Sequence, residues 1–184
     1  MRIVAGTARG RTLRGPKASG LRPTADRVRE SIFNILGQWL DGLKVLDLYA
    51  GTGALALEAL SRGAARAVLV DSGKEAQRLC RENAAALQME DRVAVLGQPV
   101  NEPTLSRVAG WGPFDLIFAD PPYSAQTPQG LLSLVSGTRL LAPSGRLVVE
   151  HDRRAEAPEQ QADLIRMDQR RFGDTMVSFY RAIS

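Results

Sequence analysis

Residues 45–54 read VLDLYAGTGA, an apolar run followed by two closely spaced glycines and then by an apolar helical pattern that begins near Ala54. Glycine adopts backbone conformations that other residues avoid, so glycines between a strand and a helix let a ligand approach the backbone closely. In open α/β sheets such ligands bind in the crevice beyond the carboxyl ends of the strands. This stretch therefore predicts an α/β fold with a binding site at the turn that holds Gly51 and Gly53.

Apolar runs and helical patterns alternate through most of the chain. The apolar runs lie at 45–49, 67–70, 93–96, 114–119 and 146–150. The helical patterns lie at 54–63, 74–89, 102–109 and 127–137. Alternation of this kind is typical of a parallel sheet with helices on both faces.

The last part of the chain has a different pattern. Residues 163–167 and 176–181 are strand-like, and Phe172-Gly173-Asp174 separates them without a helix. This spacing predicts a β-hairpin rather than another helical crossover. We therefore expect a mostly parallel seven-stranded sheet with an antiparallel last strand.

The amino-terminal residues are basic. The first 30 residues hold eight basic side chains against two acidic ones, a net charge of +6, which leaves −2 for the rest of a chain of net charge +4. Residues 2–6 and 10–14 could form a small hairpin, followed by a helix from about Asp26 to Trp39 with a buried stripe that includes Trp39. We divide the chain into a basic arm, residues 1–25, and an α/β domain, residues 26–184. Such an arm suits contact with a nucleic acid, although a solvated arm has the same composition.

Composition narrows the class of protein. A chain of 184 residues with 44% hydrophobic content fits one domain with a substantial core. It has no apolar run near the roughly 20 residues that span a bilayer, and its first residues do not resemble a signal peptide, so we expect a cytoplasmic protein without membrane association. The single cysteine, Cys80, argues against a disulfide framework and a cysteine-rich metal site. We expect it to be a buried thiol and expect no bound metal.

Two acidic residues flank the glycine turn. Asp71 ends the next strand 20 residues after Gly51, where a βαβ unit places a carboxylate that accepts hydrogen bonds from ribose hydroxyls. Asp47 precedes the turn, and its charge would hold the cationic part of S-adenosylmethionine but would oppose a pyrophosphate. We therefore favour S-adenosylmethionine over a nicotinamide dinucleotide. Both acids could instead merely cap neighbouring helices.

The most specific motif is Asp120-Pro121-Pro122-Tyr123, which follows the strand at 114–119. The two prolines restrict the backbone and donate no hydrogen bonds, so Asp120 and nearby carbonyl oxygens form a stiff group of acceptors. An exocyclic amine has two hydrogens for such acceptors, and Tyr123 could stack on its base. We predict direct methyl transfer to an unpaired or flipped-out base, with Asp120 positioning the nitrogen. The simpler interpretation is a rigid turn.

Longer stretches connect these motifs with one family. Residues 21–36, LRPTADRVRESIFNIL, follow the basic turn Arg9-Gly10-Arg11 and resemble the RsmD-type small-subunit rRNA guanine-N(2) methyltransferases. The likeness continues through 53–62, GALALEALSR, and spans nearly the whole chain.

The resemblance implies a Rossmann-like class I methyltransferase domain that methylates the N(2) amine of a guanine in 16S rRNA, with S-adenosylmethionine as cofactor. It also implies a small-subunit assembly intermediate as partner, and we expect a monomer. The implied cofactor residues are Asp47, Tyr49, Gly51, Gly53, Asp71 and Gln98. The implied RNA-binding residues are Arg9, Arg11, Arg14, Arg22 and Arg27. Catalysis is assigned to Asp120, Pro121, Pro122 and Tyr123.

The chain departs from the family pattern at two places. Gln98-Pro99 replaces the usual acidic or amide residue followed by a small one, so Gln98 is only our best candidate for the adenine contact. Ser72-Gly73 lacks a second acid, which leaves Asp71 alone there. Three other functions stay open: a DNA adenine or release-factor glutamine methyltransferase, an RNA-binding protein without catalysis, and a nicotinamide dehydrogenase.

Overall fold

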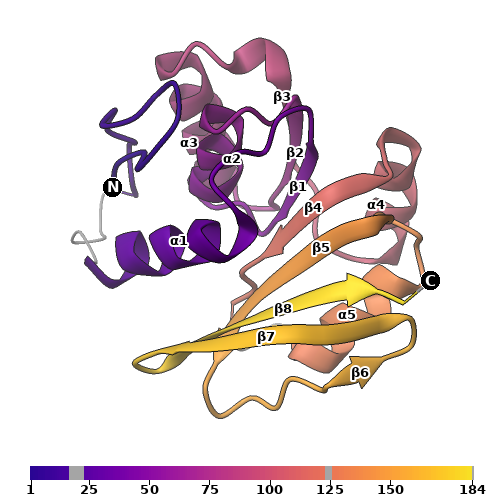
Figure 1. Ribbon diagram of the computed structural model, residues 1–184. Coiled ribbons are helices and arrows are strands. Elements are labelled where there is room, and N and C mark those ends of the chain that lie inside the picture. The colour runs from indigo at the N-terminus through magenta and orange to yellow at the C-terminus, as the bar shows by residue number, and fades with distance from the viewer. Residues whose placement is uncertain (17–22, 123–125, 184) are drawn as a thin grey trace.

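The computed structural model describes residues 1–16, 23–122 and 126–183 (Figure 1). Within these residues, eight strands form one sheet in the order β3-β2-β1-β4-β5-β8-β7-β6. The strands are β1 (Lys44–Leu48), β2 (Arg66–Val70), β3 (Val93–Leu96), β4 (Phe114–Ala119), β5 (Leu141–Asp152), β6 (Gln160–Gln161), β7 (Leu164–Phe172) and β8 (Thr175–Ala182). The helices are α1 (Pro23–Leu36), α2 (Ala54–Ser61), α3 (Lys74–Ala86), α4 (Glu102–Val108) and α5 (Pro128–Ser136), with short 3₁₀ turns at Glu90–Arg92 and Ala109–Trp111.

The strand directions confirm the predicted sheet. β3, β2, β1, β4 and β5 are parallel, whereas β8 lies antiparallel between β5 and β7. The β7–β8 hairpin is the one expected from the absence of a helix between these strands. The additional strand β6 was not predicted, because Gln160 and Gln161 carry no apolar alternation that would mark a strand.

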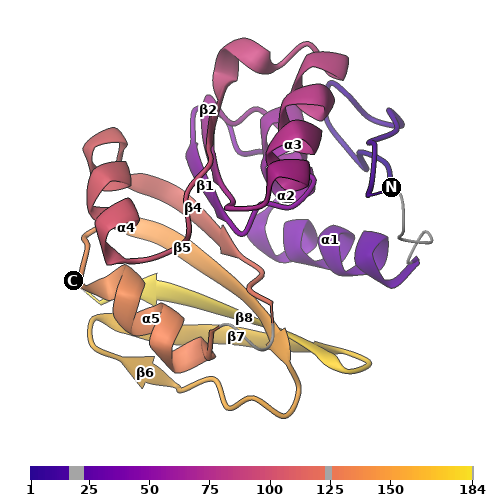
Figure 2. The ribbon, with the colours of Figure 1, turned by 180° about the vertical axis from the view of Figure 1, so that it is seen from behind.

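The sheet has helices on both faces (Figures 1 and 2) and separates two hydrophobic cores. One core packs against α1, α2 and α3, and the other against α4 and α5. Alternate residues of a strand point to opposite faces, so Val45 joins the first core while Leu46 and Leu48 join the second. Asp47 therefore points to the face covered by α1 and α2.

The amino-terminal arm is attached to α2. The amides of Val4 and Ala5 donate to the two carboxylate oxygens of Glu58 at 2.8 and 2.9 Å, and the Thr7 amide donates to the Ser61 carbonyl oxygen at 2.8 Å. The two segments of the predicted hairpin do pair: the amides of Ile3, Gly10 and Leu13 donate to the carbonyl oxygens of Arg11, Ile3 and Met1 at 3.0, 2.8 and 3.0 Å. The pairing amounts to an isolated bridge between Arg2 and Thr12 and not to regular strands. Side chains of α2 accept amide hydrogens that a regular strand ladder would use.

Helix α1 differs from the prediction at both ends. It begins at Pro23, so Asp26 lies within its first turn. It ends at Leu36, because Gly37 has a φ of 101° and donates to the Phe33 carbonyl oxygen. Trp39 therefore leaves the buried stripe and is 76% exposed, contrary to the prediction.

The buried stripe of α1 is otherwise confirmed by Val28, Ile32 and Leu36. Cys80 is a buried free thiol, as expected. None of the helices in the described ranges is long and apolar enough to cross a membrane.

Candidate active site

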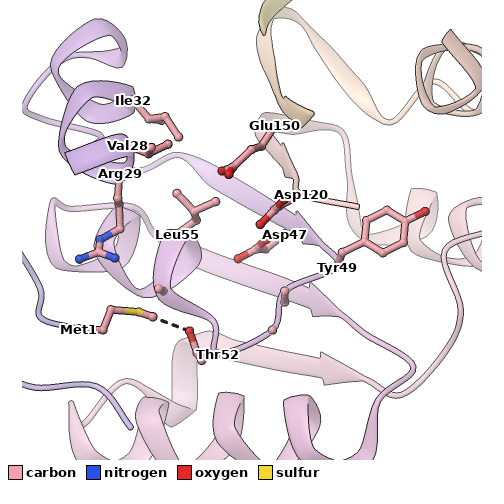
Figure 3. A pocket seen from close by; sticks show the side chains of 13 residues that line it. Met1, Val28, Arg29, Ile32, Asp47, Tyr49, Thr52, Leu55, Asp120 and Glu150 are labelled. Carbon is pink, nitrogen blue, oxygen red and sulfur yellow. Dashed lines mark hydrogen bonds between the residues drawn. The ribbon is translucent and has the colours of Figure 1, made fainter. Parts of the chain in front are cut away.

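A cavity of about 190 Å³ opens at the carboxyl ends of β1, β4 and β5, beside α1 (Figure 3). Its walls come from the amino-terminal arm, from α1, from the segment that runs from the end of β1 through the turn into α2, and from the carboxyl-terminal ends of β4 and β5. The lining residues are Met1, Val28, Arg29, Ile32, Asp47, Tyr49, Ala50, Gly51, Thr52, Ala54, Leu55, Asp120 and Glu150. The glycine turn and the Asp120 motif, 69 residues apart from Gly51 to Asp120, thus border one space.

Strand register brings three carboxyl groups to this cavity. Ala119 pairs with Leu48 on one side and with Val149 on the other. Asp120 and Glu150 are the residues directly after Ala119 and Val149, so they lie at the same level of the sheet. The residues two before them, Phe118 and Val148, belong to the core under α1. By the alternation of strand side chains, Asp120 and Glu150 point to the same face as Asp47. Figure 3 shows the three carboxyl groups converging, while the ring of Tyr49 points away from them.

The β1–α2 turn depends on Asp71 at the end of β2. One carboxylate oxygen of Asp71 accepts the Gly51 amide at 2.9 Å, and the other accepts the Gly73 amide at 2.8 Å. Gly51 and Gly53 have φ values of 56° and 77°, which favour glycine. A Cβ on Gly53 would lie 2.9 Å from a methyl carbon of Leu69. Asp71 thus stabilises the turn through these hydrogen bonds but does not line the cavity.

Asp47 is a buried acid that forms no ion pair with any residue that the structure describes. Its side chain is 2% exposed and accepts one hydrogen bond, from the Ala56 amide at 3.2 Å. Burial raises its pKa well above the ordinary value, and the charges of Asp120 and Asp71 raise it further. A cationic group bound in the cavity would favour the ionised form.

Asp120 and Glu150 also titrate above the usual range of carboxyl groups. The pocket walls surround Asp120 although solvent reaches it through the mouth, and this desolvation raises its pKa to about 6. Burial first, and then the charge of Asp120, raises the pKa of Glu150 to about 8. Within the described residues neither acid forms an ion pair, and the nearest arginine of the cavity, Arg29, is engaged elsewhere.

Arg29 belongs to a buried cluster beside the cavity. It is 4% exposed, donates to Asp26 at 3.0 Å and lies 3.7 Å from Glu58. Glu58 is fully buried and also pairs with Arg62 at 2.9 Å. In Figure 3 the guanidinium of Arg29 points away from the three acids. The cluster joins α1 and α2 to the arm and keeps Arg29 from the surface, where a phosphate-binding residue would be expected.

The remaining predicted site residues are scattered. Gln98 is exposed beyond the end of β3 and does not line the cavity. Pro121 is buried and Pro122 is exposed. Tyr123 and Arg22 lie outside the described residues. The other four predicted RNA-binding arginines are exposed: Arg9, Arg11, Arg14 and Arg27.

Glu150 and Arg29 were missed as cavity residues. The run Arg146–Glu150 contained a usable signal, because Glu150 ends a strand just as Asp120 follows one. That signal becomes specific only when β4 and β5 are known to be neighbours. The sequence around Arg29 was misleading, because a basic segment suggests an exposed arginine, whereas the side chain of Arg29 is buried.

Comparisons with known proteins agree with this architecture. The family model described as "Conserved hypothetical protein 95" matches residues 1–181. A Bacillus subtilis protein named "Putative rRNA methyltransferase YlbH" is 36% identical over 181 residues, covering 98% of each chain. "Ribosomal RNA small subunit methyltransferase D" of Escherichia coli is 37% identical over 153 residues, covering 83% of this chain and 75% of that protein. A solved structure of a hypothetical protein from Thermus thermophilus superposes with a TM-score of 0.82 and 29% identity, covering 99% of both chains.

Proposed function

We propose that this chain methylates small-subunit ribosomal RNA with S-adenosylmethionine as methyl donor, because it belongs to the Conserved hypothetical protein 95 family, which is the RsmD-type family. The observation that carries the proposal is the single cavity lined by Asp47, the glycine turn and Asp120. A cofactor site and an amine-holding acceptor must share a space for direct transfer, and this cavity meets that requirement.

The charges of the cavity fit S-adenosylmethionine. Asp47, Asp120 and Glu150 line it without an ion-pair partner among the described residues, so a cationic ligand is favoured and a pyrophosphate is opposed. Asp47 and the turn at Gly51 would hold the cofactor, with Tyr49 beside them. Asp71 would act mainly by supporting the turn, and Gln98 remains our proposal for the adenine contact. When bound, S-adenosylmethionine supplies a methyl group activated by its sulfonium.

Asp120 would hold the target nitrogen. Its carboxylate accepts an N–H of the amine, and the stiff Pro121-Pro122 segment limits the positions that the acceptor can adopt. Transfer would form a nitrogen–carbon bond and break the sulfur–carbon bond of the methyl donor, with the bonding electrons of that bond left on sulfur. Asp120 then accepts the proton that the methylated nitrogen must lose. Positioning of this kind accounts for several kcal/mol of the barrier in effective-molarity comparisons.

We infer that the target is the N(2) amine of guanine. The resemblance at residues 21–36 supports this assignment, and the open mouth at Asp120 suits a base that has left its helix. Tyr123 would stack on that base. Methylation of an adenine or of a glutamine side chain is the alternative, because Asp120 would serve those amines equally well.

The arm of residues 1–25 would dock the RNA beside the cavity. Arg9, Arg11 and Arg14 of the arm and Arg27 of α1 are exposed, and Met1 of the arm lines the cavity. Phosphate contacts by arginines would supply affinity that does not depend on sequence. Arg22 would extend this surface. Residues 26–184 then form the catalytic domain, and an assembly intermediate is the proposed partner.

The test is to map N(2)-methylguanosine in small-subunit rRNA from cells with and without this protein. Purified protein, S-adenosylmethionine and unmethylated small-subunit particles should then restore the missing modification. Asp120→Ala protein provides the matched negative control. Loss of an N(6)-methyladenosine instead would replace guanine by adenine in the proposal, and no change in any rRNA methylation would reject it.

A further inference from the structure

We propose that Glu150 selects guanine, by accepting the N1–H and one N(2) hydrogen of the base while Asp120 accepts the other N(2) hydrogen. This inference rests on the proposed function and assigns the second acid of the cavity. It explains why two carboxyl groups, rather than one, end at the mouth beside the glycine turn.

The position of Glu150 supports this role. Ala119 and Val149 are register partners, so the next residues, Asp120 just after β4 and Glu150 near the end of β5, lie at one level and on one face. Both side chains line the cavity, and in Figure 3 the Glu150 carboxyl group lies above that of Asp120. Two acceptors side by side match a base edge that presents adjacent donors.

The chemistry of the base edges favours guanine. The Watson–Crick edge of guanine presents N1–H beside the N(2) amine, and both are donors to a carboxylate. Adenine presents an unprotonated N1 beside its amine, so a carboxylate there would face a lone pair. An ionised acceptor forms stronger hydrogen bonds than a neutral one, and a pair of parallel bonds adds geometric selectivity.

Ionisation is consistent with this assignment. The raised pKa of Glu150 follows from burial and from the charge of Asp120. The other charged groups at the cavity are Asp47 and Arg29, and the Arg29 guanidinium points away. Two N–H donors from guanine favour the carboxylate over the acid, so the base itself lowers the pKa of Glu150 on binding.

A base analogue tests the inference directly. 2-Aminopurine keeps the exocyclic amine of guanine but has an unprotonated N1. After the methylated position has been mapped, ligated 16S rRNA carrying either guanine or 2-aminopurine there is assembled into small-subunit particles. Values of kcat/KM are measured for both substrates with wild-type protein and with Glu150→Gln. The glutamine amide can accept from the amine and donate to an unprotonated N1.

We expect wild-type protein to prefer guanine over 2-aminopurine by about 10- to 100-fold, the range for a hydrogen bond to a charged group. Glu150→Gln should reduce that preference at least about tenfold or reverse it. A purely structural effect would lower both rates in parallel. 2-Aminopurine also lacks the O6 atom of guanine. The loss of this atom affects the guanine/2-aminopurine ratio of kcat/KM equally in both proteins, so it cancels when the two ratios are compared.

Asp152→Asn is the matched control, since Asp152 lies on the same strand, outside the cavity, and pairs with Arg154. Its guanine preference should equal that of wild-type protein. An unchanged preference in Glu150→Gln, with N(2)-methylguanosine still formed, would overturn the inference and leave the proposed function intact. Failure of wild-type protein to methylate the guanine would instead reject the proposed function, and with it this inference.

Discussion

Asp120 and Glu150 lie side by side because the residues before them, Ala119 and Val149, are partners on neighbouring parallel strands. The two acids therefore share one mouth of the cavity, and the charge of Asp120 adds to burial in raising the pKa of Glu150. This relationship connects the ionisation of the two acids in the free protein with the proposed recognition of the base.

We predict that kcat/KM for guanine methylation rises with pH. Both acids must be ionised to accept hydrogen bonds, and their pKa values in the free protein are about 6 for Asp120 and about 8 for Glu150. Since kcat/KM reports groups of the free enzyme, it should increase between these values and level off above the higher one. In Glu150→Gln the part of the rise that belongs to Glu150 should disappear, so the profile should move to lower pH while Asp120 and Asp47 still titrate. Superimposable profiles for the two proteins would contradict the assignment.

Asp120→Asn should lower methyl transfer by about 10²- to 10³-fold, a magnitude seen when one group that stabilises a transition state is removed. The amide keeps the size of the side chain but replaces one acceptor oxygen by a donor. Binding of S-adenosylmethionine, measured by calorimetry, should stay close to that of wild-type protein. Unimpaired turnover would remove Asp120 from the mechanism.

Asp47→Asn should stabilise the protein without cofactor while weakening cofactor binding. The folded-state pKa of Asp47 is raised, so the folded state holds its proton to higher pH than the unfolded state does. The contribution of Asp47 to stability therefore falls as pH rises from the ordinary carboxyl value through the raised one. Urea unfolding of the variant near neutral pH should show a higher free energy of unfolding. Its affinity for S-adenosylmethionine should fall about 30-fold, as expected when one partner of a buried charge pair is lost.

If Asp47 only supports the β1–α2 turn, the opposite result is expected. Loss of its hydrogen bond from the Ala56 amide would then lower the free energy of unfolding. Cofactor affinity would change only as far as the turn is disturbed.

Replacing Arg9, Arg11 and Arg14 by glutamine should weaken RNA binding and flatten its salt dependence. Each lost phosphate contact should reduce the slope of log K against log salt by about 0.7 to 0.9. The matched control replaces Arg66, Arg107 and Arg139, which are also exposed but lie away from the carboxyl edge of the parallel strands. Equal slopes for the two triple variants, measured by filter binding, would argue against docking by the arm.

Glu58→Gln should destabilise the fold by about 3–5 kcal/mol, because Arg62 would remain buried without a carboxylate and Arg29 would keep only its pair with Asp26. Hydrogen exchange at the amides of Val4 and Ala5 should accelerate, since Glu58 accepts both of them. The control is Glu82→Gln, whose surface pairs with Arg14 and Arg78 should contribute little. A Glu58 variant as stable as the Glu82 variant would show that the buried cluster does not anchor the arm.

Most of the secondary structure could be read from local patterns. The expected strands at 67–70, 93–96 and 114–119 coincide with β2, β3 and β4 to within one residue. Alternation along β1 also indicates that the side chain of Asp47 points to the opposite face of the sheet from those of Leu46 and Leu48. Where a local stop signal was overlooked, as at Gly37, the prediction for Trp39 was wrong.

Periodicity and turn chemistry act over a few residues, so the amino-acid order alone determines the elements, their faces and the presence of acids at strand ends. It does not specify which strands become neighbours. The placement of Glu150 beside Asp120, the inward turn of Arg29 and the capture of the arm by Glu58 all depend on contacts between distant segments. These were decided by tertiary packing, because only the assembled sheet and its covering helices bring such groups together and out of water.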